Sequence, residues 1–257
     1  LGYHYLKEFY FYDRFHEVFG RKSNPNLHHG ALTGLEARAF EATSASNVVL
    51  NGDGAGIFAR SSYVTIDKGT RIVNSITEWG DGGGVQCMSS KLDIITSTLK
   101  YNAALQGGGV YSKDCDVHVS DSTAFEENLA YRDGGAMFLG VSTRAKLVDA
   151  QFKGNAVECP TKSYGQTVCP EWQNSVVGVQ GALDAFCIHP SCKSYMGSGG
   201  AVYVAEAGSV LLRRTDMALN TATRGGGMFV LDTLRLEILE NSSFTNNSCR
   251  RPFALVN

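Results

Sequence analysis

Gly134-Gly135-Ala136-Met137, followed by Phe152-Lys153-Gly154-Asn155, is one copy of a two-part unit that the chain repeats five times. The first part is Gly-Gly, then Gly or Ala, then an apolar residue, at 82–85, 107–110, 134–137, 199–202 and 225–228. The second part is a large apolar residue, two variable residues and an asparagine, ending at Asn102, Asn128, Asn155, Asn220 and Asn247. From the apolar residue of the first part to this asparagine is 17 to 19 residues. Units of this length cannot bury a core alone, so the repeat predicts coils that stack on one another.

The residues between the two parts indicate strands. Apolar residues come in pairs two positions apart, as in Leu92 with Ile94 and Val117 with Val119. Period two is typical of strands, while glycine runs and asparagine favour turns. We therefore expect an all-β parallel β-helix with three short strands in each coil. The asparagines would form an internal amide ladder, and the glycine pair would provide positive φ at a corner.

The repeat divides the chain into four segments. Residues 1–29 are rich in aromatic residues and are expected to cap the first coil, with an anchor to a partner or membrane surface as the alternative. Residues 30–155 and 199–257 form coils, and residues 156–198 are a cysteine-rich insertion. Leu255 stands where the next coil would open, so we expect the stack to continue or a partner to cover it. The alternative is that Arg250, Arg251 and Pro252 themselves blunt the edge.

Gly-Gly-Ala-apolar alternating with Phe-x-x-Asn resembles the repeat of the polymorphic outer-membrane proteins, the chlamydial Pmp type, which is similar to repeats in large secreted protist and algal proteins. The residues that carry the resemblance are 134–137 and 199–202, with 125–128, 152–155 and 244–247. It covers about residues 50 to 257 without the insertion. The resemblance implies a right-handed, single-stranded β-helix, a surface or adhesive role, and no catalytic residues. The chain departs from it in its Gly third positions, its insertion and the lack of a C-terminal membrane barrel. With the weaker copies that begin near Gly54 and Gly30, the sequence itself predicts six to seven coils.

Composition narrows the range of partners. The formal charge is −2 and 19% of residues are charged, which gives no indication of a nucleic-acid partner. No apolar run is long enough for a transmembrane helix. We expect protein partners in a larger assembly, with glycans as a further ligand class, and no cofactor.

Cysteines indicate the compartment. The insertion carries Cys159, Cys169, Cys187 and Cys192, for which two disulfides are expected and a zinc site is the alternative. Disulfides are typical of an oxidising compartment, so we expect an extracellular or cell-surface location, or the lumen of an organelle. Cys249 is expected to be a buried free thiol. A Cys87–Cys115 disulfide is not expected, because these residues have different offsets from their glycine parts.

Two outward columns are candidate sites. Asp93, His118 and Lys146 are expected as successive neighbours able to carry acid–base chemistry, against the alternative of a solvated face of mixed charges. Four aromatic residues would form a contact stripe, or a structural stack if they are covered: Tyr111, Phe138, Tyr203 and Phe229.

Smaller motifs point to modification or ions. Asn241 heads an Asn-Ser-Ser acceptor for N-glycosylation. Asp53, Asp81 and Asp133 precede glycine parts, where ordinary turn chemistry is expected and calcium is the alternative; we expect no metal. The sequence thus favours a non-catalytic adhesion or scaffold module, and the alternative is a carbohydrate-active β-helix enzyme, a polysaccharide lyase or hydrolase.

Overall fold

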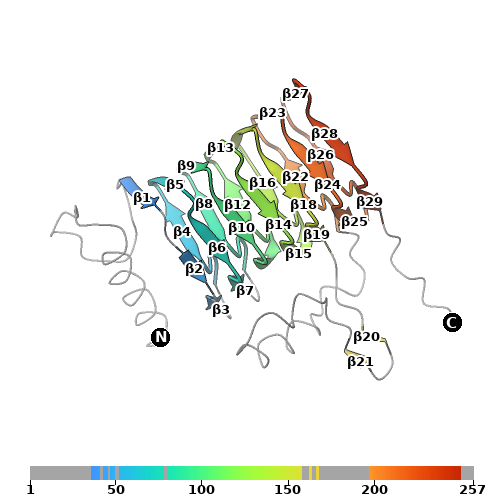
Figure 1. Ribbon diagram of the computed structural model, residues 1–257, viewed down its shortest axis with the longest axis horizontal. Helices are drawn as coiled ribbons and strands as arrows, with labels where there is room; N and C mark the ends of the chain where they lie inside the picture. The colour runs from blue at the N-terminus through green and yellow to red at the C-terminus, as the bar shows by residue number, and fades with distance from the viewer. Residues whose placement is uncertain are drawn as a thin grey trace.

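The protein is described here by a computed structural model that covers residues 36–40, 43–45, 47–49, 52–77, 80–157, 162–163, 166–167 and 197–249. Every regular element in these residues is a β-strand. Parallel strands stack into a solenoid of about six turns, and coil order along the axis follows the sequence (Figure 1). The predicted all-β parallel β-helix is confirmed. The expected N-terminal cap lies outside the described residues.

A coil contains four strands rather than the predicted three, one in each of four sheets named A to D, and the last described coil shows the first three of them. Sheet A is β1 (Glu36–Phe40), β5 (Tyr63–Asp67), β9 (Lys91–Ile95), β13 (Asp116–Ser120), β17 (Arg144–Val148), β23 (Ser209–Arg213) and β27 (Leu236–Leu239). Sheet B is β2 (Thr43–Ala45), β6 (Arg71–Val73), β10 (Thr98–Lys100), β14 (Ala124–Glu126), β18 (Gln151–Lys153), β24 (Asp216–Ala218) and β28 (Ser243–Thr245). Sheet C is β3 (Val48–Val49), β7 (Ile76–Thr77), β11 (Ala103–Gln106), β15 (Leu129–Asp133), β19 (Ala156–Val157), β25 (Thr221–Ala222) and β29 (Ser248–Cys249). Sheet D is β4 (Ile57–Arg60), β8 (Val85–Met88), β12 (Val110–Lys113), β16 (Met137–Leu139), β22 (Val202–Ala205) and β26 (Met228–Leu231).

The insertion leaves the stack in register. It departs after β19, and β16 pairs directly with β22 across it, Met137 beside Val202. Within the insertion the structure describes one antiparallel pair, β20 (Lys162–Ser163) and β21 (Gln166–Thr167). The four cysteines predicted to form disulfides there lie outside the described residues.

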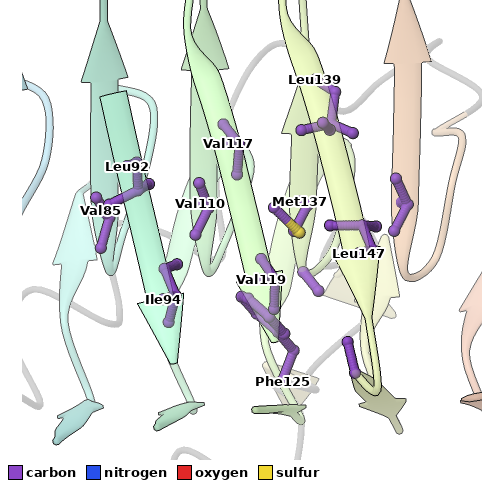
Figure 2. Close-up of a cluster of buried hydrophobic side chains, with 14 of the residues drawn as sticks. Val85, Leu92, Ile94, Val110, Val117, Val119, Phe125, Met137, Leu139 and Leu147 are labelled. Carbon is purple, nitrogen blue, oxygen red and sulfur yellow. The ribbon is translucent and has the colours of Figure 1, made fainter. Parts of the chain in front are cut away.

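The core follows from the period-two pattern. In sheet A, Leu92 pairs with Val117 and Ile94 with Val119, and all four are buried. Figure 2 shows these side chains directed between the sheets. From sheet B, Phe125 and Phe152 stack with ring centroids 4.8 Å apart. Identical positions therefore pack on each other from coil to coil.

The asparagine row forms a continuous ladder. Each side-chain amide donates to the next asparagine's Oδ1, with Nδ2···Oδ1 distances of 2.9 to 3.0 Å from Asn102 to Asn247. Each also donates to a backbone carbonyl of the preceding coil; for Asn128 this is Leu99 at 2.9 Å. In the coil before Asn102, which lacks the asparagine, Ser75 takes the ladder position, and its N–H donates to Asn102 Oδ1. Pairing in this buried row fixes the register of the coils, because an unpaired buried amide would be costly.

The two glycines of the repeat have different roles. Gly134 has φ +68°, a left-handed conformation that side chains disfavour. Gly135 has no room for a side chain, because a Cβ there would lie 2.1 Å from the carbonyl oxygen of Gly200 in the next coil. The corner between sheets C and D therefore requires both residues.

Two cysteine predictions were wrong. Cys87 and Cys115 form a disulfide between adjacent coils, with Cα atoms 6.5 Å apart. Cys87 lies within β8, whereas Cys115 follows β12 at the corner into sheet A. Both side chains are buried in the core. Because the chain turns at this corner, the two sulfurs lie close together although the residues have different offsets from their glycine parts. Cys249 is free as predicted, but exposed rather than buried. It lies in the last described coil, with no described coil stacked beyond it.

Candidate functional site

The outer face of sheet A brings the predicted acid–base residues together. Asp93 pairs with His118, and His118 pairs with Lys146, so the three are successive neighbours along the coil axis. The column continues through Leu211 and Glu237. Alternation along each strand turns these side chains outward while their neighbours enter the core.

Asp93 is the least solvent-exposed member of this column, at 7%. Its Oδ2 accepts a hydrogen bond from the Tyr63 hydroxyl at 2.5 Å and lies 3.5 Å from the Lys91 ammonium. The same ammonium lies 4.4 Å from the centroid of the Tyr63 ring, and the hydrogen bond with Tyr63 raises the pKa of Lys91. Asp93 Oδ1 is buried without a hydrogen-bond partner in the described part of the chain. The carboxylate is therefore held in place through one oxygen while the other has no partner.

This face is hollowed by a groove of about 600 Å³. Its lining includes Lys91, Asp93, His118, Lys146 and Glu237. A second hollow of about 600 Å³ follows the neighbouring corner between sheets D and A. Its lining is rich in hydroxyl groups, from Ser61, Ser62, Tyr63, Ser89, Ser90 and Ser142. Lys91 and two further residues line both hollows, Asp116 and Arg144, so the two adjoin.

Most other charges of the groove neutralise one another. Arg144 binds Asp116 through two hydrogen bonds, of 2.6 and 3.0 Å, which lower the pKa of the Asp116 carboxyl. Arg235 pairs with Glu237. Lys146 is exposed and has no ion-pair partner among the described residues, although its charge is near enough to Asp116 to lower that carboxyl's pKa further. The Lys146 ammonium is thus exposed without an ionic partner, whereas the unpaired Asp93 oxygen is buried from solvent.

The aromatic column on sheet D forms a continuous stack. Tyr111, Phe138, Tyr203 and Phe229 stack with centroid separations of 5.0, 5.1 and 5.5 Å. The two central rings, Phe138 and Tyr203, are each only 8% exposed. Burial also raises the pKa of the Tyr111 hydroxyl to about 12. This limited exposure favours the structural alternative, and a contact role for the outer rings stays a prediction.

The aspartates before the glycine parts form a different arrangement. The Asp81 N–H donates to Asp53 Oδ1 at 2.9 Å. Burial, and then the charge of Asp53, raise the pKa of Asp81 to about 7. Asp133 lies further along the same corner row and accepts from the Ser198 N–H. In the described residues no group of three or more histidine, cysteine or acidic side chains is arranged to hold a metal ion.

Asn241 is exposed at the turn between β27 and β28, with φ +56°. Its glycosylation stays a prediction.

Sequence reasoning missed Tyr63 and Lys91. Both begin their strands in sheet A, in direct register with each other, and this register was available from the repeat. Their contacts with Asp93 depend on side-chain conformations, which the periodicity of the sequence does not predict.

No known family, curated protein or solved structure matches this chain. No helix able to span a membrane occurs in the described part.

Proposed function

We propose that the chain is a non-catalytic interaction module, an adhesion or scaffold segment that presents a rigid β-helix face within a larger assembly. The observation that carries this proposal is the unbroken register of sheet A, which holds the outward side chains of successive coils in fixed positions around two adjoining grooves. A rigid surface binds with little loss of conformational entropy. The resemblance to the Pmp-type repeat agrees with an adhesive role.

The proposed location is extracellular, at the cell surface or in an organelle lumen. The Cys87–Cys115 disulfide supports it, since disulfides persist in oxidising compartments and are rare in reducing ones.

A photo-crosslinking amino acid tests which face makes contacts. Placed at Lys146 on sheet A, it should give crosslinks to extracellular or surface material when the chain is expressed in its native setting. The matched control is Lys153, an exposed lysine on the outer face of sheet B. Equal labelling from the two positions, or none from either, would contradict the proposal.

The second candidate is a carbohydrate-active enzyme, a polysaccharide lyase or hydrolase. It is favoured by one observation, the register that places Asp93 and His118 side by side in the lining of the groove. Incubation with a panel of polysaccharides, followed by chromatography of the products, separates binding from cleavage. If the chain released fragments and His118→Ala abolished their release, the enzyme would replace the module.

A further inference from the structure

A second acceptor motif for N-glycosylation lies in the last described coil. Asn246-Asn247-Ser248 has the Asn-x-Ser pattern, in which the first asparagine is the acceptor. The structure gives the two asparagines different surroundings. Asn247 is held in the ladder, where its Nδ2 donates to Met217 O at 2.8 Å, whereas Asn246 is exposed at the turn between β28 and β29, with φ +53°. The Asn246 amide has no hydrogen-bond partner among the described residues, so a modification there breaks no contact of the fold.

The exposure of Asn246 does not result from its place in the last described coil. In inner coils the same position, one residue before the ladder asparagine, is occupied by Glu127 and Leu219, and both are exposed although further coils stack beyond them. Both also have positive φ, of 50° and 60°. The position therefore faces outward at the corner between sheets B and C along the stack. Since residues as different as glutamate and leucine occupy it, the fold does not require an asparagine there.

The surface beside Asn246 suits an attached sugar. Leu219 lies one strand spacing away, since its N–H donates to Thr245 O at 3.1 Å, and it is 52% exposed. The next position along the corner is Gly154, where a Cβ would have only Glu127 Cγ within 4 Å, apart from its chain neighbours. The corner thus presents an exposed leucine and then open space. A sugar that extends from Asn246 over Leu219 removes apolar surface from water.

The corner at Asn241 is different in character. It joins sheets A and B, and in the adjacent coil it carries Arg214, which binds Asp149 and Glu240. A sugar at Asn241 would meet these ion pairs rather than apolar surface. The contacts available to an attached sugar therefore distinguish the two acceptor motifs of the coil.

We propose that Asn246 carries an N-linked glycan whose first sugar covers Leu219. In the transfer, Asn246 Nδ2 forms a bond to C1 of an oligosaccharide carried on a polyprenyl diphosphate. The bond from C1 to the diphosphate oxygen breaks, the diphosphate leaves with the bonding electrons, and Nδ2 gives up one proton. This inference goes beyond the interaction function and rests on the proposed extracellular or luminal location, because acceptor motifs of this kind are modified in secreted chains.

Peptide mass spectrometry of the chain from its native source, before and after enzymatic removal of N-glycans, tests whether the site is occupied. Removal converts a glycosylated asparagine to aspartate, so fragmentation of the peptide identifies the modified residue, and we expect Asn246. Among variants expressed in the native setting, Ser248→Ala should abolish the glycan because the motif is lost. Ser248→Thr is the matched control and should retain it, because threonine completes the same motif.

A double-mutant cycle tests the contact with Leu219. Asn246→Gln should lower the urea midpoint of the glycosylated chain, and the same change in a Leu219→Ser background should lower it less. Asn241→Gln is the control, and its effect should be the same in both backgrounds. Circular dichroism verifies that each variant is folded. Equal effects of Asn246→Gln in the two backgrounds would overturn the contact.

The occupancy measurement also separates the glycan from the function on which it depends. A secreted chain with unmodified Asn246 overturns the glycan and leaves the location and the interaction function standing. A chain recovered from a reducing compartment, with Cys87 and Cys115 as free thiols and Asn246 unmodified, overturns the location as well.

Discussion

Asn128→Ala should be one of the most destabilising single changes in the chain. The Asn128 side chain is 1% exposed and takes part in four hydrogen bonds. Its Oδ1 accepts from the N–H and the Nδ2 of Asn102, and its Nδ2 donates to Leu99 O and Asn155 Oδ1, at 2.9 to 3.1 Å. At about 1 kcal/mol of net stability for each buried bond, the loss is about 4 kcal/mol. This is a large part of a typical unfolding free energy of about 5 to 15 kcal/mol.

Asn247→Ala is the matched comparison within the same ladder. Asn247 is only part-buried in the last described coil, where water can replace lost hydrogen bonds, so its loss should cost about 1 kcal/mol. Urea unfolding followed by circular dichroism measures both variants against the parent. If Asn128→Ala costs less than about 1 kcal/mol, or no more than Asn247→Ala, the ladder does not stabilise the stack and the reasoning is refuted.

Three further perturbations test separate parts of the fold. Gly135→Ala should cost about 3 kcal/mol in urea unfolding, since its Cβ would meet the Gly200 carbonyl oxygen at 2.1 Å; a neutral effect would contradict the tight corner. Replacing both Cys87 and Cys115 by serine should lower the unfolding free energy by about 3 to 4 kcal/mol, from the 28-residue separation that the disulfide closes, and an unchanged urea midpoint would rule this out. Asp81 has a pKa raised from 3.8 to about 7, so its contribution to stability is fully present at acid pH and is lost as pH rises between these values. Asp81→Asn should therefore be more stable than the parent above pH 7 by up to roughly 4 kcal/mol, and a parental stability that does not fall over this pH range would contradict the raised pKa.

The sequence was sufficient for the stack because its constraints repeat. In every coil the same position requires a glycine without room for Cβ, a buried asparagine or an apolar pair of period two. Aligning the five copies therefore predicts which residues of successive coils lie beside each other. The two-residue strands such as β7 and β19 were missed because they lie in the short spacer after the asparagine, where two residues show no periodicity. These strands explain why each coil has four sides.

Side-chain contacts between residues far apart in the sequence were harder to predict from the sequence. The Cys87–Cys115 disulfide was not predicted, because the distance between the two residues was inferred from their offsets along straight strands. The chain turns a corner before Cys115, so these offsets do not give the distance. The column Asp93–His118–Lys146 follows from register alone, and the structure places it as predicted. The Tyr63 and Lys91 contacts that leave one Asp93 oxygen unpaired required coordinates, since they depend on how three side chains turn toward each other.

The central claim is that residues far apart in sequence lie in straight rows along one axis, because both the groove and the ladder depend on it. Val73 and Thr245 belong to one outward row of sheet B, linked through successive pairings with Lys100, Glu126, Lys153 and Ala218. Five strand spacings place their backbones about 24 Å apart. Spin labels attached through unnatural amino acids at these two positions allow this separation to be measured by double electron–electron resonance. The account predicts a single narrow distribution near that distance after allowance for the label arms, and a broad distribution or one centred well beyond it would contradict the stacked coils.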